Sequence, residues 1–504
     1  MKNSIQSFNR LRSCIEGDPF VIIIVISFIA FSIYWSYISI MKFYSLDAYV
    51  FDLGLAMQKA WGFMLYPFNI YPNMILWLIF PLFIPKSFLL ILIFQAIFIT
   101  MGIFPLYGIS KHLFKERLSS MLIALSYLFY PYLSGMYYFD FHYQALFPTL
   151  FLFGYYFLIK NKYKSSFVMF ILAGITRYPY ILFILLLSIV LLIENLYSMK
   201  YKKSDFQISR LKFSFSLFFI SLIVLILFNP SNNLNIHSGL LANAHYSGGS
   251  LFNIIDNKIF VLTIIFFPFM GLPLFSKKFI ILYLPFIYLL FFSNFWGYTF
   301  PIFLKLQYGP LIVSFLYLGT IDALSKIFNK KGNFTEKKKD HRLKTILKNK
   351  RLKIVSIILI LLVLLDLTYT PYGPLNIYSE TNFNINSVTS VNWTRFNDLE
   401  HIVNMIPKND PYILIQNNLP EIFPIYNILP YENSTLTPAL YTFLKNSTIN
   451  NIYMKAPSGH VYRIKIDYVL LDVNSIWYTA KNGLSMYDIS KLLYGSGKFG
   501  IMAE

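Results

Sequence analysis

Long apolar segments recur along this chain, and they constrain its fold more than any other feature. Runs such as 20–40, 88–107 and 354–367 approach the roughly 20 apolar residues that a helix needs to cross a bilayer. Hydrophobic residues make up 56% of the chain and charged residues 13%, which lies outside the range of soluble globular proteins. The alternating pattern of a membrane barrel is absent from these runs. The sequence therefore predicts an α-helical polytopic membrane protein.

Basic residues are concentrated in short segments between the apolar runs. Segment 326–353 carries twelve Lys or Arg against two acids, whereas 370–504 carries nine against ten. Because loops rich in Lys and Arg stay in the cytoplasm, this pattern predicts a cytoplasmic N-terminus in the cell membrane. A topology signal with contacts to anionic membrane lipid explains the net charge of +20 better than nucleic-acid binding does. Eleven crossings place every basic cluster inside, near 20–42, 86–108, 118–134, 143–160, 165–176, 178–197, 213–229, 258–275, 279–296, 306–322 and 354–369.

These crossings divide the chain into two predicted domains. Residues 1–369 form the membrane domain, with an extracytoplasmic first loop at 43–72. Residues 370–504 then lie outside the membrane, where apolar residues at helical spacing and short apolar strands predict a small α/β domain. A single cysteine, Cys14, excludes disulfides within the chain and thiolate metal clusters. The loop at 135–142 is also expected on the extracytoplasmic side.

Two acids directly follow the first predicted crossing. Asp47 and Asp52 lie in segment 44–61, in a chain that has only 23 Asp and Glu among its 504 residues. A partly desolvated carboxylate can serve as a general base if it lies within hydrogen-bond reach of the reacting hydroxyl. Asp52 could instead cap a helix that begins at Leu53, or bind a metal ion. A divalent metal ion as cofactor stays open.

Four further residues are candidates for substrate binding. Asp140 and His142 would share one side of an extended segment, where they could orient an acceptor, bind a divalent ion or mark a hydrated helix end. Arg177 stands in an apolar run and needs a partner, either a lipid phosphate or an acid such as Asp140 or Asp52. Lys305 could contact phosphate or anchor a helix at the interface.

Several motifs resemble a known family. They are FDLGLAMQKAW at 51–61, the long apolar stretch at 71–110, FDFHYQALFPTLFLFGYYFL at 139–158, LQYGPLIV at 306–313, 406–431 and IDYVLLD at 466–472. Together they resemble the domain-of-unknown-function family numbered 2079, predicted membrane proteins of archaea and bacteria that look like members of the GT-C glycosyltransferase superfamily. The chain departs from the family pattern at 69–72 and 176–178.

The resemblance implies a GT-C-like fold and inverting transfer of a sugar from a polyprenyl-phosphate donor to a glycan or protein acceptor outside the membrane. It further implies that an acid in the first outside loop is the catalytic base, with Asp52 in the FDLG motif as first choice and Asp47 as second. A transporter or lipid-glycan flippase is the alternative, although no internal repeat is evident in the sequence. The departures from the family pattern keep a non-catalytic membrane scaffold open as well.

Overall fold

Most of the membrane region is described by the computed structural model of this chain. The described residues are 18–45, 88–177, 180–201, 205–227, 251–292, 309–329, 341–370, 391–405, 413–415, 428–430, 451–455, 461–465, 468–470 and 491. Asp47, Asp52 and Lys305 lie outside these ranges.

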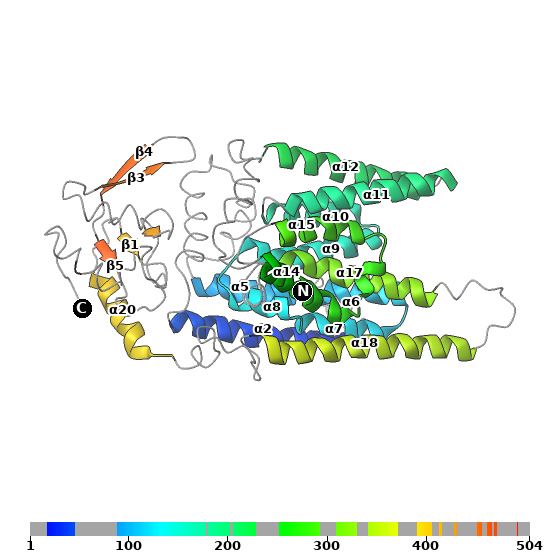
Figure 1. The fold of residues 1–504 in the computed structure, drawn as a ribbon, viewed down its shortest axis with the longest axis horizontal. Coiled ribbons are helices and arrows are strands. Elements are labelled where there is room, and N and C mark those ends of the chain that lie inside the picture. The colour runs from blue at the N-terminus through cyan, green and yellow to red at the C-terminus, as the bar shows by residue number, and fades with distance from the viewer. Residues whose placement is uncertain are drawn as a thin grey trace, which may run out of the picture.

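Helices dominate the described chain up to residue 405. The first group is α2 (Phe20–Tyr44), α5 (Phe88–Thr100), α6 (Ile103–Phe114), α7 (Arg117–Leu128), α8 (Pro131–Tyr138), η2 (Tyr143–Leu146), α9 (Phe147–Ile159) and α10 (Tyr163–Ile175). The second group is α11 (Ile181–Tyr201), α12 (Asp205–Leu227), α14 (Leu251–Phe266), η5 (Phe267–Phe269), η6 (Leu272–Phe275), α15 (Ile280–Phe292), α17 (Pro310–Asn329), α18 (His341–Tyr369) and α20 (Trp393–Met405). The long helices of the membrane region lie side by side (Figure 1).

The helices agree with the prediction of a helical membrane protein. Each predicted crossing overlaps a helix or a pair of helices. Among the described residues, six helical segments are long and apolar enough to span a bilayer, namely Phe20–Tyr44, Leu89–Phe114, Ile181–Ser198, Ile208–Ile226, Leu311–Phe328 and Asn349–Tyr369. The chain is therefore an α-helical membrane protein, and the count of eleven crossings stays a prediction.

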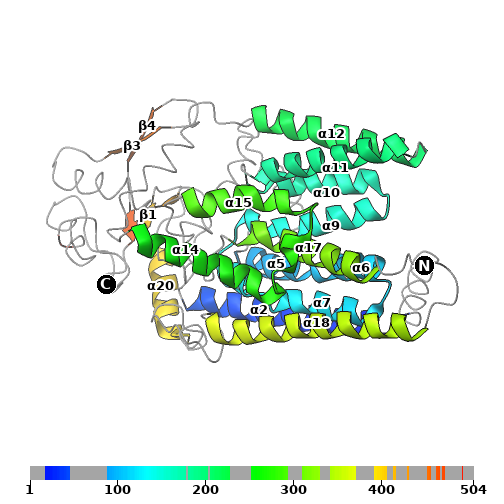
Figure 2. The ribbon, with the colours of Figure 1, turned by 45° about the vertical axis from the view of Figure 1, so that its right-hand side comes forward.

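Helix α17 forms the centre of the packed region. Its span is mostly buried, whereas only a small share of the residues in the spans of α2 and α18 is buried, as expected for helices whose apolar side chains face lipid. The ring of Phe315 on α17 packs edge-on against Phe151 of α9, with ring centres 5.0 Å apart, and Tyr317 packs in the same way against Phe269 at 5.0 Å. Large aromatic rings in edge-to-face contact thus fill the interior, and α2 and α18 lie at the edge of the helices (Figure 2).

The predicted crossing at 118–134 and the loop after it differ from the structure. Helix α7 ends at Leu128, and α8 begins at Pro131, because a proline cannot continue the hydrogen bonding of α7 but fits the first position of a new helix. The segment expected to be an outside loop, 135–142, belongs partly to α8 and is mostly buried. Tyr137 and Phe141 are each 1% exposed. Its aromatic side chains therefore pack into the protein rather than face water.

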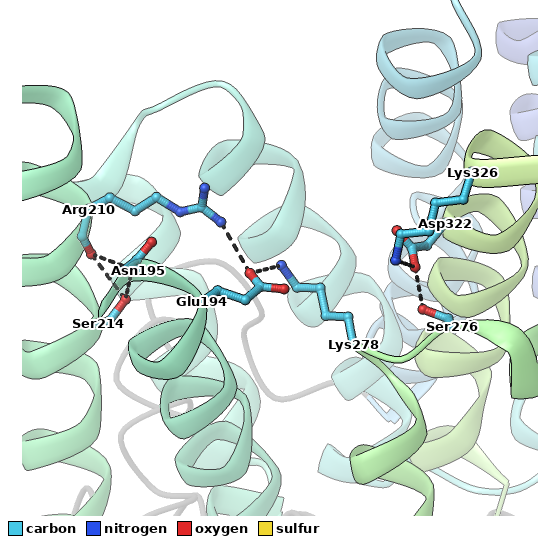
Figure 3. A network of polar contacts seen from close by, with 8 residues as sticks. All are labelled: Glu194, Asn195, Arg210, Ser214, Ser276, Lys278, Asp322 and Lys326. Atoms are coloured by element: carbon cyan, nitrogen blue, oxygen red, sulfur yellow. Dashed lines mark hydrogen bonds and ion pairs between the residues drawn. The ribbon is translucent and has the colours of Figure 1, made fainter. Parts of the chain in front are cut away.

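A polar network gathers at the end of the helices where α11 finishes and α12 and α15 begin (Figure 3). The carboxylate of Glu194 accepts from Lys278 Nζ at 2.8 Å and from Arg210 Nη2 at 3.4 Å. Burial alone would lower the pKa of Lys278, but the charges of Tyr155 and Glu194 raise it above the ordinary lysine value. Asp322 and Lys326 form a second pair at 2.6 Å near the end of α17.

The same end carries the basic residues that the sequence assigned to loops on one side. Lys111 binds the carboxylate of Asp18, which precedes α2, and the guanidinium of Arg351, ten residues after the start of α18, lies 5.0 Å from the ring centre of Phe114. Basic groups of α6 and α18 thus both lie close to the end of α6. The assignment of this end to the cytoplasm stays a prediction.

Short strands follow α20 in the tail. Strands β1 (Ile413–Ile415), β2 (Ile428–Pro430) and β5 (Tyr468–Leu470) form a parallel sheet in the order β2-β1-β5, and β3 (Asn451–Lys455) pairs antiparallel with β4 (Val461–Lys465). Both lie with α20 beyond the end of the helices opposite the polar network (Figure 1). The described part of the tail is small, so the α/β domain at 370–504 stays a prediction.

Candidate functional site

A buried ion pair joins the end of α2 to the segment after α8. Lys42 Nζ lies 2.8 Å from Asp140 Oδ1, and the two side chains are 4% and 0% exposed. The same ammonium donates to the carbonyl oxygen of Tyr138 at 3.1 Å and lies 4.9 Å from the centre of the Tyr138 ring. Burying an isolated charge at this depth is costly, so the two groups stabilise each other in place. This pair and its neighbours form the candidate site.

One glutamine fixes the backbone that carries Asp140. Gln95 Nε2 donates to the carbonyls of Met136 at 2.9 Å and Phe139 at 3.1 Å, and Gln95 Oε1 accepts from the backbone N–H of His142 at 2.9 Å. The last carbonyls of a helix have no partner within it, so Gln95 satisfies groups that would otherwise be buried without one. It is the only amide side chain in α5, FLLILIFQAIFIT.

His142 and Arg177 extend this polar segment. The ring atom Nδ1 of His142 lies 2.8 Å from the backbone oxygen of Asp140, and Arg177 Nη1 donates to Oε1 of the buried Gln144. The structure thus joins Asp140 with His142 and, through Gln144, brings Arg177 to the same short segment. Asp140 was one of the acids that the sequence suggested as a partner for Arg177. In the structure it forms an ion pair with Lys42 rather than with Arg177. Arg177 itself is exposed, which leaves its guanidinium accessible.

Aromatic residues connect this site to the tail. The ring of Tyr44, at the end of α2, lies 5.1 Å from Trp393 and 5.0 Å from Phe396 of α20, measured between ring centres. Phe43 contacts Phe396 at 6.4 Å. Helix α20 of the tail therefore packs directly against the turn of α2 that supplies Lys42.

A second acid lies inside an apolar helix at the same end. Asp366 Oδ1, near the end of α18, accepts a hydrogen bond of 2.6 Å from Ser134 Oγ of α8. Thr370 donates to the backbone oxygen of Asp366. No basic side chain within the described ranges forms an ion pair with Asp366. An acid in a membrane helix is costly and usually functional, so Asp366 belongs with the candidate residues.

Sequence reasoning missed Lys42, Gln95 and Asp366. Lys42 is the only charged residue of α2, Gln95 the only amide of α5 and Asp366 the only acid of α18, and this signal could have identified all three. Their partners are distant in sequence, since Lys42 and Asp140 are 98 positions apart, so no local pattern pairs them.

The two predicted catalytic acids and one predicted phosphate contact cannot be placed. Asp47, Asp52 and Lys305 lie outside the described residues. Among the residues that are described, no group of three or more His, Cys, Asp or Glu side chains could hold a metal ion.

Comparison with known proteins gives the family. A search of curated proteins found no match to the chain. The profile of the family described as "Predicted membrane protein (DUF2079)" matches residues 69–424, which is more than two thirds of the 504-residue chain. The matched range includes Gln95, Asp140 and Asp366 and excludes Lys42. The chain belongs to this family of predicted membrane proteins.

Proposed function

We propose that this protein is a GT-C-like membrane glycosyltransferase that moves a sugar from a polyprenyl-phosphate donor to an extracytoplasmic glycan or protein acceptor. One observation carries the proposal. The buried Lys42–Asp140 pair lies in the last turns of α2, and Asp47 and Asp52 follow the end of that helix by three and eight residues in the sequence. A charged, buried support at the end of α2 suits a reaction carried out by acids that follow this helix in the sequence, because catalytic groups need supporting residues that hold them in place.

In the proposed reaction, Asp52 removes the proton from an acceptor hydroxyl as its oxygen attacks the anomeric carbon of the sugar. The bond between that carbon and the phosphate oxygen breaks, and polyprenyl phosphate leaves with the bonding electron pair. Asp47 is the second candidate for the base. The proposed topology puts this loop outside the cell, with the N-terminus inside, eleven crossings, and 370–504 as an extracytoplasmic α/β domain.

Four residues are proposed to bind the donor or to position the acceptor. Arg177 suits the donor phosphate, because an exposed guanidinium can hold two phosphate oxygens at once. Lys305 would add a point charge on phosphate. Asp140 has its charge matched by Lys42, so it serves as a positioning group for the segment that carries His142 rather than as a second base. A divalent metal ion remains open as a cofactor.

The transporter or flippase alternative has one observation in its favour. Asp366 lies in an apolar helix without an ion-pair partner among the described residues, and transporters use ionisable groups within the membrane. Replacement of Asp366 by asparagine separates the two functions. A flippase would lose lipid-glycan movement across the bilayer, whereas the transferase would keep its sugar-transfer chemistry. A non-catalytic scaffold would show neither lipid-glycan movement nor sugar transfer, with or without the Asp366 replacement.

The proposal is tested by Asp52→Asn in the native host. Membrane insertion is checked first, and surface glycoproteins and glycolipids are then analysed by mass spectrometry. We expect a glycan to shorten or disappear, because the amide cannot accept the hydroxyl proton. Asp322→Asn makes the same chemical change in the polar network near Lys326 and is the matched control. Unchanged glycans in Asp52→Asn would remove this residue as the base, and Asp47→Asn would then test the second candidate.

A further inference from the structure

Arg351 is a buried cation without a hydrogen-bond acceptor in the part of the chain that the structure describes. It is 7% exposed, and its Nε and Nη1 atoms are enclosed and make no hydrogen bond. It is the third residue of the span Asn349–Tyr369. Leaving a charged donor buried and unsatisfied costs more than the hydrogen bond itself, and native proteins satisfy almost all such groups with protein atoms, water or an ion. These two donors therefore indicate a missing acceptor.

The surrounding protein orients the guanidinium without supplying that acceptor. The guanidinium carbon lies 5.0 Å from the ring centre of Phe114, a contact that covers one face of the group and leaves its edge donors available. Glu116 is the acid whose charge acts on Arg351. Its two carboxylate oxygens, however, accept from the backbone N–H groups of Leu118 at 2.9 Å and Ser119 at 2.8 Å, where they cap α7.

The other charges at this end favour an anion. Asp18 is bound by Lys111 and by the hydroxyl of Tyr107, so its carboxylate is already neutralised. Lys350 and Lys353 lie beside Arg351 on α18 and are exposed. An anion that reached Arg351 would therefore meet a positive field from both lysines.

We propose that Arg351 is the centre of a phosphate-binding site at the basic end of the helices. A guanidinium matches a phosphate group because two parallel N–H groups can donate to two phosphate oxygens. Arg351 lies two residues into the candidate span, or about 3 Å along the helix from its first residue, so a helix that crosses the bilayer with this span would hold Arg351 near the lipid headgroups. A phospholipid headgroup and a soluble phosphate share this chemistry.

This site is separate from the proposed transferase site. Arg351 and Asp366 are 15 residues apart on α18, which corresponds to roughly 22 Å of helix. Loss of phosphate binding at Arg351 and loss of sugar transfer at Asp52 are therefore distinguishable by experiment.

The test measures phosphate ligands retained by the full-length protein. Delipidated protein in detergent is mixed with dioctanoylphosphatidylglycerol, and the bound lipid is counted by native mass spectrometry. We expect a one-to-one adduct with the wild type and a loss of affinity of about tenfold or more in Arg351→Gln, since charged hydrogen bonds are strong. Lys162→Gln removes the same charge from an exposed lysine just before α10, outside the proposed site, and should change affinity by less than about twofold.

Inorganic phosphate identifies the source of the ligand. If it displaces the lipid adduct from the wild type, the site accepts soluble phosphate; if the adduct persists, the site requires the lipid, and both results support the proposal. Equal retention by wild type and Arg351→Gln would overturn it, as would an equal loss in Lys162→Gln. Should Arg351→Gln fail to fold, Arg351→Lys keeps the charge but not the two-point geometry, and wild-type affinity in that variant would also overturn the proposal.

Discussion

Replacement of Lys42 by methionine removes the cation from the most completely buried ion pair described in this protein. Its ammonium lies 2.8 Å from Asp140, and both side chains are almost inaccessible. At an effective dielectric constant of 20, two unit charges at this distance attract each other by about 6 kcal/mol. Part of this is offset by desolvation, and measured costs of breaking a buried pair are about 3–5 kcal/mol. We expect Lys42→Met to lower the free energy of unfolding by that amount, because Asp140 is left buried without its cation.

The assay is unfolding by SDS titration in mixed micelles, followed by tryptophan fluorescence. Lys326→Met is the matched control, because its pair with Asp322 is as short, at 2.6 Å, but its side chain is 47% exposed. That variant should cost less than about 1 kcal/mol. The double variant Lys42→Met with Asp140→Asn should cost clearly less than the sum of the two single changes. A Lys42→Met cost no larger than that of Lys326→Met, or strict additivity, would refute the reasoning.

Three further predictions follow from described contacts. Burial alone would raise the pKa of Asp18, but hydrogen bonds from its lysine and tyrosine partners lower it. The carboxylate of Asp18 therefore stabilises the fold above about pH 4, and this stabilisation is lost on acidification. Between about pH 5 and 2 the melting temperature of Asp18→Asn should therefore fall less than that of the wild type. Glu194→Gln should lower the free energy of unfolding by about 1–3 kcal/mol in the same SDS titration, because it leaves the mostly buried Lys278 without this carboxylate. Arg210 is partly exposed and lies 3.4 Å from Glu194, so Arg210→Gln should lower it by less than about 1 kcal/mol. Equal losses in the two variants would argue against a role for burial. Gly309→Ala places a methyl group 2.8 Å from the Cβ of the buried Tyr132, so we expect the free energy of unfolding to fall by about 1–3 kcal/mol. A melting temperature equal to that of the wild type would contradict this close packing.

The positions of the helices were largely predictable from hydrophobicity. The first crossing was expected at 20–42 and α2 covers Phe20–Tyr44, because an uninterrupted apolar run leaves little choice of structure. The break between α7 and α8 was not predicted. Pro131 signals it, but the residues on both sides are apolar or aromatic, so hydropathy alone joins them.

The polar contacts of the site were less predictable. The sequence singled out Asp140 and His142, which the structure brings together, and Arg177, which contacts Gln144. It did not identify Lys42, since a lysine at the end of a span is also an ordinary interfacial anchor. Which acid this lysine meets depends on how α2 packs against α8, and that is determined by the side chains of the whole interface rather than by either segment.

Sugar transfer dependent on Asp52 is tested most directly with purified protein in liposomes. The donor is a labelled polyprenyl-phosphate-sugar extract from the native host, the acceptor is its membrane fraction, and release of free polyprenyl phosphate is measured. We expect turnover by the wild type and by Asp322→Asn, and a loss of about a hundredfold or more in Asp52→Asn, the usual contribution of a general base. No release by the wild type, or equal release by Asp52→Asn, would contradict the proposed function.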